Sequence, residues 1–216
     1  MKLRARFRDR IDGSPAIADD APMGSGDPNR HGMPKLPPDQ TETTKWPVLD
    51  LGVRPTVETA DWRLAIDGAC TNPLTLDWPE LLALEQVEDT SDFHCVTAWS
   101  QMNIVWRGVR LADVIAAAEP TAAAAFLMCH GYDGYTTNLP LEEALKPDVL
   151  VAHTADGEPL PREHGGPVRI VTPQLYAWKG TKWIKRIELT ETDRPGFWEE
   201  RGYSMTAHPW RNDRYS

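Results

Sequence analysis

The distribution of apolar residues along the chain restricts its fold more than any other feature. Short stretches that alternate apolar and polar residues, as β-strands do, are separated by short stretches with helical spacing. No long amphipathic helix joins two of these strands, as a doubly wound parallel sheet would require. The sequence therefore predicts an α+β domain, built on a mixed β-sheet with short helices.

The same pattern places the individual elements. Strands are predicted at residues 62–66, 74–76, 88–95, 123–130, 149–153, 168–172 and 183–190. Asp77 is a candidate N-cap for one short helix, and two more are expected at 111–118 and 141–145. A turn is expected around Trp106. The alanine-rich stretch 123–130 fits a helix equally well, and that alternative stays open.

The chain divides into two parts of different character. Residues 1–44 show little periodic apolar pattern and many Gly, Pro, Asp and Arg, so an irregular N-terminal arm is predicted, either disordered or wrapped around the rest. Residues 45–216 are predicted to form one domain that is long enough to bury a core. The aromatic tail from Asp193 is expected to fold back over that domain.

Composition excludes several classes of function. The formal net charge is -9 and the pI is about 5.1, which argues against a nucleic-acid partner. No apolar segment reaches the roughly 20 residues that span a bilayer. The three cysteines, Cys70, Cys95 and Cys129, are widely spaced and fit a reducing compartment. No apolar run of signal-peptide length follows the basic N-terminus, so a cytoplasmic location is expected.

The run from Ser91 to Ser100 is the first candidate for chemistry. It places the imidazole of His94 beside the thiol of Cys95 at the end of a predicted strand. A thiolate is a soft ligand for zinc and redox metals. The alternative is that Cys95 is a small buried apolar residue. A zinc site drawn from other His and Cys residues is also possible, but their spacing is unconstrained.

Two basic segments form the second candidate. Residues 163–169 contain two adjacent glycines and Arg169, and residues 178–183 contain Lys179 and Lys182 around Gly180. Glycines allow close approach of the backbone to a ligand, and clustered cations in an acidic protein suit a phosphate or a large anionic cofactor. A solvated basic loop remains the alternative. No GxSxG, HExxH, Walker A or GxGxxG motif is present.

Three blocks of sequence, in order, resemble one known family. They are Phe93–Ser100 with Trp106–Val109, Gly134–Leu141, and His164–Val171 with Tyr176 and Lys179–Ile184. Together they resemble the molybdopterin-dependent oxidoreductases that include sulfite oxidase and the catalytic subunit of protein-methionine-sulfoxide reductase. The resemblance covers about residues 46–190 and implies a sulfite-oxidase-type molybdopterin-binding domain.

The resemblance implies roles for particular residues. Cys95 matches the cysteine whose thiolate binds molybdenum, and Arg169 matches an arginine that holds the cofactor. Residues matched to the cofactor site are His130, His164, Arg169, Lys179, Gly180, Thr181 and Lys182. His164 stands where the reductase has an asparagine, and His130 falls near a cofactor-contacting threonine. His94, Trp99 and Tyr132 are candidate pocket residues by their proximity in sequence to the metal ligand, and ordinary packing is the alternative for each.

Two functional hypotheses follow. The first is a molybdenum–molybdopterin oxidoreductase that transfers an oxygen atom, with two electrons, to or from a small sulfur or nitrogen oxide such as sulfite or a sulfoxide. It implies a small-molecule substrate and an external electron donor or acceptor, because the sequence has no haem or flavin signature. The second is a non-catalytic domain of the same fold that binds an anionic ligand or a protein partner.

Overall fold

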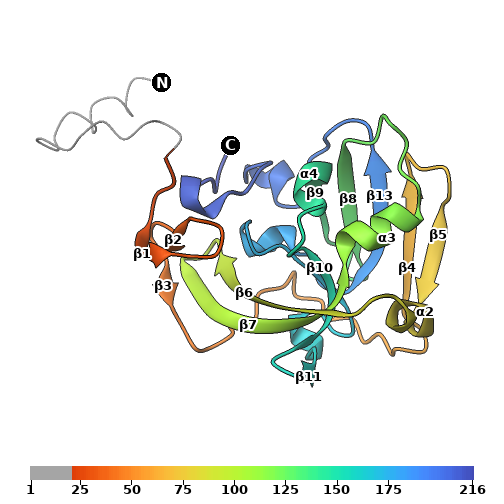
Figure 1. Cartoon of the computed structure of the whole chain (residues 1–216), viewed down its shortest axis with the longest axis horizontal. Coiled ribbons are helices and arrows are strands. Elements are labelled where there is room, and N and C mark those ends of the chain that lie inside the picture. The colour runs from red at the N-terminus through yellow and green to blue at the C-terminus, as the bar shows by residue number, and fades with distance from the viewer. Residues whose placement is uncertain (1–20) are drawn as a thin grey trace, which may run out of the picture.

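The computed structural model describes residues 21–216 and contains mixed β-sheets with few short helices, which confirms the predicted fold class (Figure 1). The first 20 residues of the expected arm lie outside the described residues. Two main sheets, of six and five strands, carry the domain, and a two-stranded sheet pairs β1 (Ser25–Pro28) with β2 (Pro34–Leu36).

The five-stranded sheet has the order β5-β4-β13-β8-β9. Its strands are β5 (Leu74–Asp77), β4 (Arg63–Gly68), β13 (Ile184–Thr190), β8 (Phe126–Gly131) and β9 (Thr136–Pro140). The β13–β4 pair is parallel and the other pairs are antiparallel, so the sheet is mixed. Strands far apart in the sequence thus become neighbours.

The six-stranded sheet carries the Cys95 strand. Its strands are β3 (Thr41–Glu42), β6 (Val87–Cys95), β7 (Trp99–Arg110), β10 (Leu150–Ala155), β11 (Glu158–Pro159) and β12 (Arg169–Val171). β6 and β7 form a long antiparallel hairpin, and β10 pairs with β7. In Figure 1 this hairpin curves away from the five-stranded sheet.

The α-helices within residues 21–216 are short, and each contributes buried residues to the core. They are α2 (Trp78–Ala83), α3 (Leu111–Ala117) and α4 (Leu141–Ala144). As predicted, Asp77 caps α2: its carboxylate accepts from Glu80 N at 2.9 Å, and the Glu80 carboxylate accepts from Asp77 N at 2.8 Å. Buried residues of α3 pack with apolar residues of β4, β8 and β13 in one cluster.

Two local predictions were wrong. Trp106 does not lie in a turn but inside β7, because β6 and β10 both pair with this part of the strand. The strand β9 was not predicted, because Thr137 and Asn138 are polar although both are fully buried. Residues 123–130 are partly strand, since β8 begins at Phe126, and no helix forms there.

The described part of the arm and the tail meet on the side of β6 that carries His94. The arm contributes β3, which pairs in parallel with the start of β7. The tail packs on the domain through 3-10 turns η3 (Glu199–Arg201) and η4 (Pro209–Arg211). Trp210 is buried and its indole N–H donates to the Pro34 carbonyl at 2.6 Å. The tail therefore folds back, as its aromatic content predicted.

Candidate functional site

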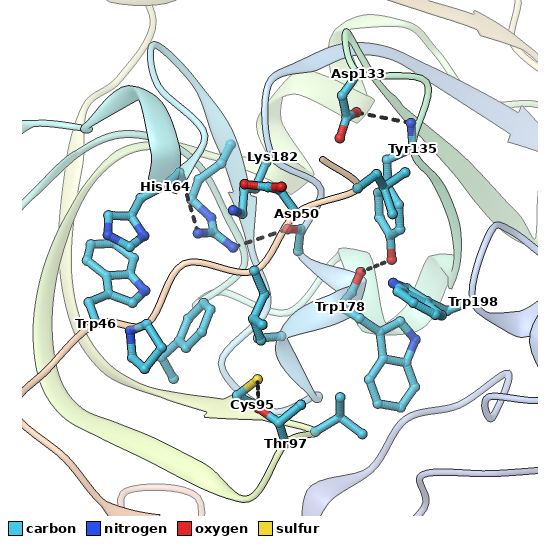
Figure 2. Close-up of a pocket in the computed structure, with 18 of the residues that line it drawn as sticks. Trp46, Asp50, Cys95, Thr97, Asp133, Tyr135, His164, Trp178, Lys182 and Trp198 are labelled. Carbon is cyan, nitrogen blue, oxygen red and sulfur yellow. Dashed lines mark hydrogen bonds between the residues drawn. The ribbon is translucent and has the colours of Figure 1, made fainter. Parts of the chain in front are cut away.

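A cavity of about 350 Å³ opens between the end of β6, the loops after β12 and the tail (Figure 2). Its lining consists mainly of aromatic and apolar side chains with a few charged ones. The lining residues used below are Trp46, Asp50, Phe93, Cys95, Thr97, Trp99, Asp133, Tyr135, His164, Arg169, Trp178, Gly180, Lys182, Trp198 and Tyr203. A concave, mostly apolar cavity with a few convergent polar groups is typical of a cofactor site.

Cys95 is the last residue of β6 and is 5% exposed. Side chains alternate along a strand, so Phe93 and Cys95 face the cavity while His94 faces the other side. The thiol lies 3.1 Å from Thr97 Oγ1. Burial raises the pKa of the Cys95 thiol, while the Thr97 hydrogen bond and the charges of Arg214 and Lys182 act in the opposite direction. A bound metal ion would favour the thiolate.

Arg169, the first residue of β12, supplies a buried cation. Its guanidinium donates to the carbonyls of His164 at 3.0 Å and Gly180 at 3.1 Å, and it lies over the Phe93 ring at 5.1 Å. Burial lowers its pKa to about 10, so the group is charged at neutral pH. These bonds tie the two basic segments together. At Gly180 an added Cβ would lie 2.7 Å from the Ile170 carbonyl oxygen, so only glycine fits.

Lys182 and His164 lie at the same end of the cavity in Figure 2. Lys182 Nζ donates to the Glu163 carbonyl at 2.7 Å, and burial, then the charge of Arg169, lowers its pKa to about 8. The His164 ring stacks on Trp46 with centroids 3.9 Å apart. Burial, followed by Arg169, lowers the His164 pKa to about 4, so this imidazole is neutral at pH 7.

The pKa of Lys182 makes anion binding in the cavity pH-dependent. A lysine is charged below its pKa, so raising the pH from 7 to 9 neutralises most of Lys182 while Arg169 stays charged. Sulfate keeps its charge over this range. We expect its affinity for the cofactor-free protein, measured by titration calorimetry, to fall up to about tenfold. In Lys182→Gln this loss of sulfate affinity should disappear. An equal loss in the variant would show that Lys182 is not the group that makes binding pH-dependent.

Six of the predicted site residues meet at this cavity and the others do not. The six are Cys95, Trp99, His164, Arg169, Gly180 and Lys182. On the far side of β6, His94 is buried with Nδ1 2.8 Å from Ser100 Oγ. On β8, His130 lies 3.5 Å from Glu188 and next to Arg186.

The remaining three predicted residues lie outside the cavity lining. Tyr132 Oη bonds both backbone groups of Arg63, each at 3.0 Å. Thr181 is fully buried. Lys179, also fully buried, forms an ion pair at 2.6 Å with Glu199 of the tail and a hydrogen bond with Asn138. None of these side chains lines the cavity.

The structure also adds residues that sequence reasoning did not identify. They are the aromatic side chains Trp46, Tyr135, Trp178, Trp198 and Tyr203 and the carboxylates Asp50 and Asp133. Tyr135 Oη donates to the Trp178 carbonyl at 2.6 Å, which joins the residue before β9 to the basic segment 178–183. Tyr135 and Trp178 lie inside segments that the sequence singled out, and the aromatic content of the tail pointed to Trp198 and Tyr203.

This geometry agrees with the comparisons to known proteins. The sequence model described as oxidoreductase molybdopterin binding domain matches residues 51–198. The chain belongs to this family. The resemblance noted in the sequence is thereby confirmed, and the protein is a molybdopterin-dependent oxidoreductase.

Individual members of the molybdopterin-binding oxidoreductase family are similar over different lengths. The uncharacterized oxidoreductase YuiH of Bacillus subtilis is 41% identical over 183 residues, which cover 84% of this chain and 92% of YuiH. The catalytic subunit MsrP of the protein-methionine-sulfoxide reductase of Gluconobacter oxydans is 32% identical, over 68% of this chain and 54% of MsrP. The chain thus spans about half the length of MsrP.

A solved structure has a similar fold over part of the chain. The crystal structure of the sulfane dehydrogenase SoxCD from Paracoccus pantotrophus matches with a TM-score of 0.60 and 25% identity. The match covers 64% of this chain and 40% of the SoxCD chain. It supports the sulfite-oxidase-type fold that the sequence predicted.

The residues around the cavity fit a molybdopterin group. Cys95 offers a soft ligand to a metal, Arg169 and Lys182 offer cations to a phosphate, and Gly180 lets the backbone come close. In residues 21–216, no three or more His, Cys, Asp or Glu side chains gather as a metal site. Within the same range, no helix is long and apolar enough to cross a bilayer.

Proposed function

We propose that this oxidoreductase holds a molybdenum–molybdopterin cofactor in the cavity beside Cys95. The proposal further assigns Cys95 as the protein ligand to molybdenum. In this proposal the enzyme transfers an oxygen atom, together with two electrons, to or from a small sulfur or nitrogen oxide. The observation that carries it is the thiol of Cys95 facing the same cavity as the buried cation Arg169 and the half-buried cation Lys182.

The cofactor, when bound, supplies a metal that exchanges two electrons and an oxygen atom. The chain supplies binding and orientation. Lys182 and Arg169 attract the phosphate of the pterin, and the neutral ring of His164, fixed by stacking on Trp46, offers hydrogen bonds without adding charge. Thr97 orients the thiol of Cys95.

The surroundings of Cys95 favour a neutral substrate. Figure 2 shows Lys182 and His164 at one end of the cavity and Cys95 with Thr97 at the other, near Trp178. Trp99, Trp178, Trp198 and Tyr203 provide aromatic surface there. Such a wall suits an uncharged oxide with an apolar substituent, such as a sulfoxide, better than the sulfite anion. The similarity to MsrP, whose name specifies methionine sulfoxide, supports this choice.

Metal content tests the proposal. The full chain is purified from a host that makes molybdopterin and from an isogenic host that cannot, and molybdenum is measured per chain. We expect near-stoichiometric molybdenum only from the first host. Folded protein without molybdenum from both hosts would overturn the proposal and favour the non-catalytic binding domain.

Loaded enzyme is then assayed with methyl sulfoxides and with sulfite, using an external electron donor or acceptor. The expected cytoplasmic location stays a prediction, which cell fractionation would test.

A further inference from the structure

The turn that carries Cys95 depends on contacts from both ends of the chain. This turn, residues 95–99 between β6 and β7, is called the Cys95 turn below. Its own bonding is slight: Ala98 N donates to the Cys95 carbonyl at 3.2 Å, and Ala98 has a φ of 70°. Positive φ is unfavourable for alanine, so the surroundings must hold this conformation.

From the arm, Gln40 holds the start of the turn. Its side-chain amide donates to the Cys95 carbonyl at 3.0 Å and accepts from Ser100 Oγ at 3.1 Å. Ser100 Oγ lies 2.8 Å from His94 Nδ1. The amide of Thr41 adds a bond to the Ala98 carbonyl at 3.0 Å. Ser100 and Gln40 thus link the imidazole of His94 to the Cys95 carbonyl on the side opposite to the cavity.

From the tail, Arg214 holds the middle of the turn. Its guanidinium donates to the Val96 carbonyl at 3.1 Å and to the Pro38 carbonyl at 3.3 Å, and its Nε donates to Tyr176 Oη at 3.0 Å. It also lies over the Tyr176 ring, 5.5 Å from the centroid. One planar cation therefore joins the Cys95 turn, the arm, the tail and the segment before η2 (Ala177–Lys179).

We infer that Arg214 and Gln40 are positioning residues that fix the direction of the Cys95 thiolate toward the metal. Both lie outside residues 51–198, which the family model matches. They bind the carbonyls of Cys95 and Val96, so they restrain the backbone on the C-terminal side of the Cys95 Cα. A metal–thiolate bond needs a particular sulfur position, and contacts behind the ligand set that position. The inference rests on the proposed function.

Hydrogen exchange of the cofactor-free full chain is the first test. In Arg214→Gln the Val96 carbonyl loses its donor, so amides of residues 96–98 should exchange about tenfold faster or more. Gln40→Met keeps the side-chain length but removes the hydrogen bonds, so it should also speed the exchange of these amides. Arg211→Gln is the matched control, because Arg211 is an exposed arginine of the same tail. Equal exchange in Arg214→Gln and Arg211→Gln would overturn the inference.

The spectrum of the loaded enzyme is the second test. A displaced thiolate should shift or broaden the visible absorption of the sulfur-to-molybdenum transition in Arg214→Gln and leave it unchanged in Arg211→Gln. Arg214→Lys keeps the charge but not the planar fork, so it should not restore the spectrum. Full restoration by lysine, or an unchanged spectrum in Arg214→Gln that binds molybdenum, would overturn the inference alone. Wild-type protein without molybdenum would overturn both the inference and the proposed function.

Discussion

Cys95→Ser is expected to abolish oxygen-atom transfer while leaving the protein folded. The hydroxyl of serine is a hard, weakly acidic ligand, so it replaces a thiolate poorly on a soft redox metal. Even substitutions of residues behind a metal ligand cost up to about a hundredfold, so loss of the ligand itself should cost at least about a hundredfold in turnover. Turnover per bound molybdenum is the measurement, made with a methyl sulfoxide, together with the visible sulfur-to-metal absorption.

Cys70→Ser provides the matched control for this loss. Cys70 carries the same thiol, is half-buried, and does not line the cavity. Its variant should keep both the absorption and the turnover of the wild type. If Cys95→Ser retained the absorption band, or turned over within a few-fold of wild type, Cys95 could not be the ligand to the metal.

Lys179→Met is expected to cause the largest loss of stability. Lys179 and Glu199 have fully buried side chains, and Glu199 Oε1 also accepts from Thr137 Oγ1 at 2.8 Å and from Trp178 Nε1 at 3.0 Å. Methionine leaves the carboxylate of Glu199 buried without its cation. Breaking a buried ion pair in this way costs about 3–5 kcal/mol in the free energy of unfolding. Urea denaturation of the cofactor-free chain measures it.

A double variant separates the buried charge from lost packing. In Lys179→Met with Glu199→Gln neither side chain is charged, and the glutamine oxygen can still accept from Thr137 and Trp178. Most of the lost stability should therefore return. Lys45→Met, at an exposed lysine, should change stability by less than about 0.5 kcal/mol. If Lys179→Met were as stable as Lys45→Met, the ion pair between Lys179 and Glu199 would contribute little to the free energy of unfolding.

Much of the fold could be predicted because its strands alternate in a regular way. The alternation of β4, β6 and β13 and the N-cap at Asp77 depend on neighbouring residues, so the sequence contains them. β9 was not predicted because its burial depends on residues far away in the sequence. Its polar Thr137 and Asn138 are buried only because Glu199, Lys179 and other distant groups bond them. A pattern of local polarity cannot show such partners.

The residue types of the site could be predicted from the sequence, but the directions in which several side chains point could not. Cys95, Arg169 and Lys182 were identified from residue type and family resemblance, and the structure brings them to one cavity. His94 was expected beside the metal because it precedes Cys95, although neighbours on a strand point to opposite faces. Lys179 and Lys182 are near in sequence, but the chain turns at Gly180 between them, and only Lys182 lines the cavity.

The position of the tail in the sequence bears on when the enzyme can take up the proposed cofactor. Trp198 and Tyr203 line the cavity, and Glu199 and Arg214 fasten this wall to the domain. A ribosome makes these residues after every other part of the lining. A nascent chain that has the Cys95 hairpin and both basic segments therefore still lacks the wall that Trp198 and Tyr203 provide. Uptake of a large cofactor through that open side, followed by closure as the tail docks, is the order of assembly that this arrangement permits.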